Sequence, residues 1–262
     1  MTIASAVRKL AAAGCVYAEE EASILAEAAR TTEQLEAMVA RRAAGEPLEY
    51  VVGWTAFRGI RLAVDEGVFV PRARSGFLVE QAASLVRCRS GPGRRVVVID
   101  LCCGVGAIGA AVANEVPQVD LHAADIDSRA VACARMNLAA LGAAVHHGDL
   151  FDALPRRLRR RTDVLVASPP YVPTEEIRLL PPEAREFEST IALDGGVDGF
   201  DLVRRIARGA RQWLSAEGCL ALEVGEGQRD HVALILEDLG YLTRAVTSEE
   251  HGSAVVIGRR PR

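Results

Sequence analysis

The chain has 262 residues, of which 50 % are hydrophobic, 25 % are charged and 5 % are aromatic, and its formal net charge is −4. This composition is that of a globular protein and excludes a disordered chain. The negative balance predicts no general attraction to nucleic acid or to an anionic membrane. Lys9 is the only lysine, which excludes a P-loop, an internal Schiff-base lysine and the Tyr-x-x-x-Lys pair of a reductase.

The cysteines are sparse and do not have the spacing of a metal site. None of them forms a Cys-x-x-Cys pair, and no histidine cluster accompanies them, so no structural metal is expected. They are also too few for a disulfide-stapled secreted fold, and we interpret them as reduced thiols of a cytoplasmic protein. They are Cys15, Cys88, Cys102, Cys103, Cys133 and Cys219.

The nearly apolar run from Val96 to Ala113 has the length of a membrane span, but it contains Asp100 and three glycines. A carboxylate without a partner is costly in lipid, so the run is predicted to be a strand, a tight turn and a helix. No membrane association is expected.

Residues 1–47 are predicted to form a small helical domain. Ala, Glu and Leu are abundant there, and apolar residues recur at helical spacing. Thr31 followed by Gln34 is typical of a capping box at a helix start. Between residues 48 and 70 the pattern changes to short strands and glycine turns, which predicts a β-hairpin linker. Residues 71–262 are predicted to form the main domain.

From residue 96 onwards, strand-like and helix-like segments alternate. The strand-like runs are Val96–Asp100, Val119–Asp125, Ala144–His147, Val164–Ser168, Cys219–Val224, Tyr241–Val246 and Ala254–Gly258. The helical stretches between them are Ile108–Asn114, Ser128–Leu141, Phe200–Leu214 and Gln228–Leu239. This alternation predicts an α/β fold with a doubly wound, mostly parallel seven-stranded sheet of Rossmann-like type. The connection between the last two runs is too short for a crossover helix, so the final strand is predicted to be antiparallel.

The segment VVVIDLCCGVGAIGAAV predicts a ligand site at the end of the first strand of this sheet. A strand that ends at Asp100 is followed by a glycine turn and by a helix that starts near Ala107. Glycines let the backbone approach a ligand, and the start of a helix offers free N–H groups. Gly104-x-Gly106-x-x-Gly109 also matches the dinucleotide pattern, which arises often by chance. We expect a nucleotide-like ligand here, with a merely structural tight turn as the alternative.

Two carboxylates follow the next two strands. Asp125 is placed to accept hydrogen bonds from both hydroxyls of a ribose. Alternatively it caps the helix that starts near Ser128, a role for which Asp127 competes. Asp149 is placed to contact an adenine amino group, with Leu150 against the ring, or else it only forms a turn.

The run Ser168-Pro169-Pro170-Tyr171 comes directly after the fourth strand, beside the expected cofactor crevice. Two consecutive prolines fix the backbone and carry no N–H, so the loop presents rigid acceptors. Such acceptors can hold the NH2 group of an amide or an exocyclic amine, while Tyr171 offers a flat face. Positioning of this kind is the main catalytic device when S-adenosylmethionine supplies the methyl group. The alternative is a proline-rich loop boundary without a chemical role.

The motifs DLCCGVG, AADID, HHGDLF and SPPY, in this order, resemble a class I S-adenosylmethionine-dependent methyltransferase that acts on nitrogen. More narrowly, the chain is similar over nearly its whole length to the HemK/PrmC family of peptide chain release factor glutamine methyltransferases. GEPLEYVVG, VFVPRARSGFLVEQA and FESTIALDGGVDG also carry this resemblance. It implies S-adenosyl-L-methionine as the cofactor, a release factor as the protein partner, and methylation of a glutamine side-chain amide. Nucleic acid is not expected to be the direct substrate.

The resemblance also implies a set of site residues. It implies catalytic roles for Ser168, Pro169, Pro170 and Tyr171. It implies that the cofactor is bound by Asp100, Leu101, Cys102, Gly104, Gly106, Asp125, Ile126, Asp149, Leu150 and Ser168.

Several positions depart from the family pattern, mostly in the substrate half. Ser168 stands where the family has Asn, and the loss of one preorganised polar contact can lower a rate roughly 100- to 1,000-fold. Cys102 stands where the family usually has Gly. Arg74, Ser75 and Gly76 replace an acidic residue and a Thr-Glu pair, and Ser189 replaces the proline of a Glu-Pro pair. These departures leave open a paralogue with another acceptor.

Other functions stay open from the residues alone. One is an N-methyltransferase for nucleic acid or for a small amine or amide, and another is a cofactor-binding regulator without catalysis. A third, a dinucleotide oxidoreductase, predicts thermal stabilisation by nicotinamide cofactors, which we expect to be absent. The arginine run Arg156–Arg161 is interpreted as solvated surface, with a contact to RNA or to an acidic partner as the alternative. The long acidic segment Val172–Gly199 is predicted to be a lid or specificity element over the acceptor site.

Overall fold

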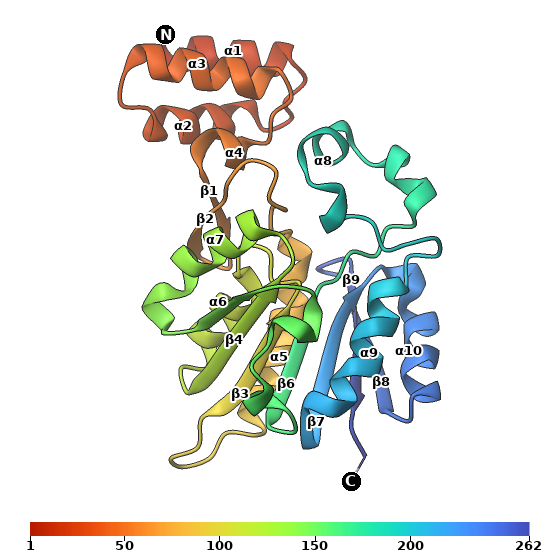
Figure 1. Cartoon of the computed structure of the whole chain (residues 1–262). Helices are drawn as coiled ribbons and strands as arrows, with labels where there is room; N and C mark the ends of the chain where they lie inside the picture. Colours follow the sequence, from red (N-terminus) through yellow and green to blue (C-terminus); the bar gives the residue numbers. More distant parts are fainter. Residues whose placement is uncertain (262) are drawn as a thin grey trace.

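A computed structural model describes residues 1–261 of the chain, in which a group of short helices and a hairpin precede a large sheet flanked by helices (Figure 1). The short helices have a hydrophobic core of their own, in which Leu10, Leu25 and Val39 are fully buried. The Thr31 hydroxyl accepts a hydrogen bond from the Gln34 N–H at 3.2 Å, which caps the third helix. The helices are α1 (Ile3–Ala12), α2 (Ala18–Ala28), α3 (Thr32–Ala43) and α4 (Leu48–Val52).

The segment that follows differs in part from the predicted strands and turns. Leu48–Val52 form the helix α4, which Gly53 ends in the left-handed conformation with a φ of 78°. The hairpin itself is shorter than the segment 48–70. It consists of the antiparallel strands β1 (Trp54–Phe57) and β2 (Ile60–Ala63).

Seven strands form one sheet, with the order β5-β4-β3-β6-β7-β9-β8. Neighbouring strands from β5 to β7 are parallel, whereas β9 is antiparallel to both β7 and β8. The prediction of a doubly wound, mostly parallel sheet with an antiparallel final strand is therefore confirmed. The strands are β3 (Val96–Leu101), β4 (Val119–Asp125), β5 (Ala144–His147), β6 (Thr162–Ala167), β7 (Leu214–Val224), β8 (Leu242–Ser248) and β9 (Ser253–Arg259).

Helices cover both faces of this sheet because the central strands are apolar on both sides. Along β6, for example, Val164 and Val166 pack on one face and Leu165 on the other. One face carries α5 (Gly76–Arg87), α6 (Ala107–Glu115) and α7 (Ser128–Leu138), and the other carries α9 (Asp201–Trp213) and α10 (Arg229–Asp238). None of the helices over residues 1–261 has both the length and the apolar character that a membrane crossing requires.

The short helix α8 (Pro182–Phe187) lies in the long connection between β6 and α9. In Figure 1 this connection and the amino-terminal helices both lie beyond the edge at which the parallel strands end. Arg42 of α3 and Glu183 of α8 form an ion pair at 3.3 Å, so the two parts are in contact. The carboxyl edge of the sheet is therefore enclosed from two sides, which is where doubly wound folds bind their ligands.

Candidate active site

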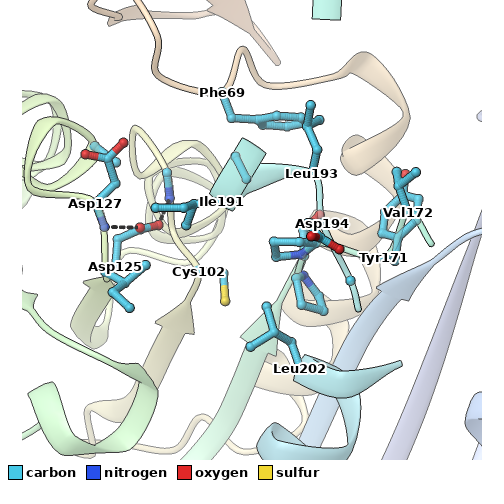
Figure 2. A pocket seen from close by; sticks show the side chains of 18 of the residues that line it. Phe69, Cys102, Asp125, Asp127, Tyr171, Val172, Ile191, Leu193, Asp194 and Leu202 are labelled. Carbon is cyan, nitrogen blue, oxygen red and sulfur yellow. Dashed lines mark hydrogen bonds between the residues drawn. The ribbon is translucent and has the colours of Figure 1, made fainter. Parts of the chain in front are cut away.

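A cavity of about 660 Å³ opens at the carboxyl edge of the sheet. Its size lies within the range of small-molecule and cofactor sites. Figure 2 shows Asp125 and Tyr171 on opposite sides of it, with Cys102 between them and Phe69 on a further wall. The predicted site residues that line it are Cys102, Gly104, Asp125, Ile126, Asp149, Leu150, Ser168, Pro169, Pro170 and Tyr171.

Three predicted cofactor residues do not line this cavity but support the turn beneath it. Asp100 and Leu101 are fully buried. The Oδ2 atom of Asp100 accepts the Gly109 N–H at 2.9 Å, which ties the strand β3 to the first turns of α6. At Gly106 a Cβ atom would lie 2.9 Å from Leu138 of α7, so this glycine allows the two helices to pack closely. These residues hold in place the turn that borders the cavity.

The buried Asp100 gives the fold a specific pH dependence. Burial raises the pKa of this carboxyl group to about 7, against the opposing effect of the Gly109 N–H. Because an unfolded aspartate titrates near a pKa of about 3.9, the folded protein binds this proton more tightly than the unfolded chain. The contribution to stability is therefore complete below about pH 4 and is lost as the pH rises towards 7.

We expect the free energy of unfolding of the wild type, minus that of Asp100→Asn, to fall by roughly 2 kcal/mol between pH 5 and pH 8. The variant keeps an oxygen for the Gly109 N–H but has no group that titrates at this position. Urea unfolding at several pH values measures the difference. Parallel pH profiles of the two proteins would show that Asp100 does not titrate in this range.

Asp125 at the end of β4 orders the glycine turn. Its Oδ2 atom accepts the Gly104 N–H at 2.8 Å, and its Oδ1 atom accepts the Asp127 N–H at 2.9 Å (Figure 2). The cap of α7 is instead Asp127, whose side chain accepts the Arg129 N–H at 2.9 Å. Burial raises the pKa of Asp125, although both N–H groups oppose this effect. Each carboxylate oxygen keeps a second lone pair, so Asp125 can also accept from hydroxyl groups of a ligand.

The turn before α6 is held open towards the cavity. Cys102 and Gly104 both have a φ of 54°, in the left-handed region that glycine adopts most easily. A Cβ atom on Gly104 would meet nothing within 4 Å, so packing inside the protein does not require glycine there. Asn137 of α7 donates a hydrogen bond to the Val105 carbonyl at 2.9 Å and fixes the turn from behind. The open side of the turn is therefore available to a ligand.

The far end of the cavity combines apolar walls with a charged pair. Ile126 lines the cavity and is 50 % exposed, as expected for a side chain that a ligand covers. Leu150 and the residue before it, Asp149, also line the cavity. The Asp149 carboxylate is 2.7 Å from the Arg205 guanidinium of α9. Asp149 both starts the turn Leu150–Ala153 and lines the cavity, so its contact with an adenine stays a prediction.

These features fit S-adenosylmethionine. A ribose needs paired acceptors, which Asp125 offers, and an adenine ring needs apolar contacts and a polar edge, which Ile126, Leu150 and Asp149 offer. The open turn at Gly104 leaves room for the backbone to approach the amino-acid part. Across residues 1–261, no three His, Cys, Asp or Glu side chains gather as a metal site.

The corner that follows β6 faces the same cavity. Pro169 and Pro170 are buried, and Tyr171 is held on its carbonyl side by the Gln228 side-chain amide at 2.9 Å. The backbone of Gly195 packs against it, and a Cβ atom there would lie 2.8 Å from the Tyr171 Cα. The corner is therefore rigid, in agreement with the two prolines.

Residues of the segment Val172–Gly199 form one wall of the cavity. Leu180, Ile191 and Asp194 belong to this wall. Glu188 anchors the segment, because its carboxylate lies 2.6 Å from the Arg72 guanidinium and accepts the Val70 N–H at 3.3 Å. The connection thus covers the side of the cavity at which Tyr171 lies.

Sequence analysis missed two charged residues of this site, Arg74 and Glu223. Both line the cavity, and the nitrogen Nε of Arg74 lies 3.8 Å from Oε1 of Glu223. A charged residue near the carboxyl end of the apolar run 219–224 was a signal for Glu223. Arg74 was noted only as a departure from the family pattern, and its place beside Glu223 depends on tertiary packing.

The arginine run Arg156–Arg161 lies elsewhere. Its five arginines are exposed, they precede β6 at the opposite edge of the sheet, and none of them has an ion pair among the residues that the structure describes. The run is therefore not part of this site.

Comparisons with known proteins agree with this geometry. The family model "Methyltransferase small domain" matches residues 76–180. The chain is 35 % identical over 225 residues to the release factor glutamine methyltransferase of Geobacter sulfurreducens, covering 85 % of this chain and 76 % of that protein. It is 41 % identical over 200 residues to the ribosomal protein uL3 glutamine methyltransferase of Bordetella pertussis, covering 74 % of this chain and 64 % of that protein.

Among solved structures, the hMettl16 catalytic domain in complex with an RNA hairpin superposes with a TM-score of 0.58 and 13 % identity, over 85 % of this chain and 81 % of that one. This likeness shows the fold alone. The two curated relatives named above are 35 % and 41 % identical to this chain over the aligned residues. The chain belongs to the family of release factor glutamine methyltransferases.

Proposed function

We propose that this protein transfers a methyl group from S-adenosylmethionine to the side-chain amide nitrogen of a glutamine in a peptide chain release factor. The observation that carries the proposal is the meeting, in one cavity, of Asp125 beside an open glycine turn and of the rigid corner Ser168–Tyr171. The first fits a nucleoside and the second fits a planar nitrogen acceptor. The family of the chain supplies the nature of the acceptor.

The cofactor supplies a methyl group on a positively charged sulfur, which is already a good leaving group. The protein therefore needs only to orient the acceptor and to exclude water. Pro169 and Pro170 fix the corner so that its acceptors hold the N–H groups of the amide, and the ring of Tyr171 supports the amide plane. The wall formed by Val172–Gly199 shields this place from solvent. No side chain is required as a nucleophile.

Mass spectrometry of a release factor tests the proposal. After incubation with the protein and S-adenosylmethionine, a tryptic peptide with the acceptor glutamine should gain the mass of one methyl group. Fragmentation should place it on the glutamine side chain. The absence of this gain on release factors would contradict the proposal.

Ribosomal protein uL3 is a second candidate acceptor, because the chain is also similar to uL3 glutamine methyltransferases, at 37 % and 41 % identity over the aligned residues. It belongs in the same assay as a parallel substrate. Methylation of uL3 but not of release factors would support glutamine methylation as the reaction and contradict the release factor as the substrate.

Ser168 is expected to limit the rate, because its hydroxyl is shorter than the amide that the family has at this position. We expect Ser168→Asn to raise kcat/KM for the acceptor about 10-fold or more, and Ser168→Ala to lower it about 10-fold. Steady-state methyl transfer to the release factor measures both. If Asn does not help and Ala does not hurt, Ser168 does not contact the acceptor.

A further inference from the structure

A buried carboxyl group without a hydrogen-bond partner on one of its oxygens lines the cavity beside the acceptor corner. The Glu223 side chain is 2 % exposed and belongs to the cavity wall. Among the described residues, its Oε2 atom has no hydrogen-bond partner. Buried polar atoms are nearly always paired in folded proteins, so an exception at the wall of a binding cavity indicates that a ligand completes it.

Glu223 lies beside the corner that holds the acceptor. The strands β6 and β7 are paired with Ala167 opposite Leu222, so the next residues, Ser168 and Glu223, emerge side by side at the carboxyl edge. A group bound at Ser168 therefore lies close to the Glu223 carboxyl group.

Arg74 covers both Glu223 and Tyr171. Its nitrogen Nε is 3.8 Å from Oε1 of Glu223, which is longer than a hydrogen bond. Its guanidinium carbon lies 5.8 Å from the centre of the Tyr171 ring and one nitrogen donates to the Tyr171 hydroxyl. The Arg74 side chain is 46 % exposed, so it can move aside without disturbing the core.

We propose that Glu223 and Arg74 together recognise a primary carboxamide, a statement that rests on the proposed function. The carboxyl group of Glu223 accepts an N–H of the amide, and the guanidinium of Arg74 donates to the amide oxygen. A primary amide presents an N–H donor and an oxygen acceptor on the same carbonyl carbon and in one plane. In this site Glu223 supplies the acceptor that the shorter Ser168 cannot place as near as the family's Asn.

The pair distinguishes a carboxamide from other acceptors. An amine would use Glu223 but would place its positive charge beside Arg74, which is unfavourable. A carboxylate would be attracted to Arg74 and repelled by Glu223. Only a neutral group with both functions satisfies the two side chains at once.

Calorimetric binding of three peptides, with the protein free of cofactor, tests this recognition. The peptides copy the release factor sequence around the acceptor glutamine and carry Gln, Met or Lys at the acceptor position. We expect the wild-type protein to bind the Gln peptide about 10-fold more tightly than the Met peptide. Glu223→Met and Arg74→Met should each remove this preference, and KM for the Gln peptide should rise by a similar factor. Glu223→Gln keeps an acceptor oxygen and should retain part of the preference.

Asp163→Asn is the matched control. Asp163 is also a 2 % exposed carboxyl group, but it lies at the start of β6 and pairs with Arg94 at 2.5 Å, far along the strand from the cavity. This change should leave the preference for Gln intact, whatever it does to stability. The Tm of Glu223→Met should be no lower than that of the wild type, because the change removes an unpaired buried oxygen. A residue with a purely structural role would lower the Tm instead.

The outcomes separate this inference from the proposed function. Binding of the Gln peptide that depends on Glu223, without methyl transfer, would overturn the proposed function and keep the recognition. Methyl transfer with equal Gln preference in Glu223→Met and the wild type would overturn the recognition and keep the function. Tightest binding of the Lys peptide, or no binding of the Gln peptide by the wild type, would also overturn the recognition.

Discussion

Replacing Asp125 by alanine is expected to raise the Kd of S-adenosylmethionine about 100- to 1,000-fold. The role that we propose for this carboxylate is to accept both ribose hydroxyls, and hydrogen bonds to a charged acceptor contribute about 1.5–3 kcal/mol each. The same oxygens hold the Gly104 and Asp127 N–H groups at 2.8 and 2.9 Å, so the change also releases the turn that faces the cavity. Isothermal titration calorimetry with the cofactor measures the loss.

Asp120→Asn is the control for this prediction. Asp120 belongs to the same strand β4, but its side chain is 52 % exposed at the opposite end of the strand. This variant should bind the cofactor within about twofold of the wild type, since it touches no part of the cavity. Because the pKa of Asp125 is raised, wild-type affinity should also begin to fall on acidification at a higher pH than for an ordinary aspartate. If Asp125→Ala is folded and binds S-adenosylmethionine with the wild-type Kd, Asp125 does not contact the cofactor.

The main features of the sheet could be predicted because they depend on local patterns. Apolar runs of strand length gave the positions of β3 to β9 to within two residues, except that β7 begins at Leu214, five residues before the predicted Cys219. The antiparallel direction of β9 followed from the short connection after β8, which leaves no room for a crossover helix. The helix α4 could not be predicted in this way, because five residues between a proline and a glycine are too short to show a helical period.

The site divides in a similar way. Asp125 and Ser168 follow strands that end at one edge, and parallel strands bring such residues together in any doubly wound sheet. The partners Arg74 and Glu223 lie far apart in the sequence and meet only after the whole fold has formed. The same holds for Arg72 and Glu188, whose ion pair joins two loops that no sequence pattern connects. Contacts of this kind depend on tertiary packing and leave no periodic signal.

Replacing Arg72 by alanine is expected to destabilise the protein by about 2–3 kcal/mol at pH 8. The change leaves the Glu188 carboxylate, which is 2 % exposed, without its charged partner. Removing one member of a buried ion pair costs about 3–5 kcal/mol, and the lower figure here reflects the 36 % exposure of the Arg72 side chain. Since Glu188 anchors the wall of the cavity, the amides of the segment Val172–Gly199 should also exchange faster with solvent.

The pH dependence and the variants Glu188→Gln and Arg185→Ala show whether loss of the Arg72–Glu188 ion pair causes the destabilisation of Arg72→Ala. Burial already raises the pKa of Glu188 and Arg72 opposes this effect, so the pKa rises further in Arg72→Ala. The folded variant then binds the Glu188 proton more tightly than the unfolded chain, and the destabilisation should shrink as the pH falls from 8 to 5. Glu188→Gln should recover most of the loss in the double variant, because no buried charge is left unpaired.

Arg185→Ala changes a pair in the same segment, between Arg185 and Glu186, whose side chains are 40 % and 57 % exposed. Loss of this exposed pair should cost less than about 0.5 kcal/mol, and hydrogen exchange of the segment should stay as in the wild type. Equal effects of Arg72→Ala and Arg185→Ala would show that the segment is not anchored through Glu188. A loss in Arg72→Ala that does not change with pH would point to the packing of Arg72 on Phe69, where its guanidinium lies 4.9 Å from the ring centre, in place of the charge pair.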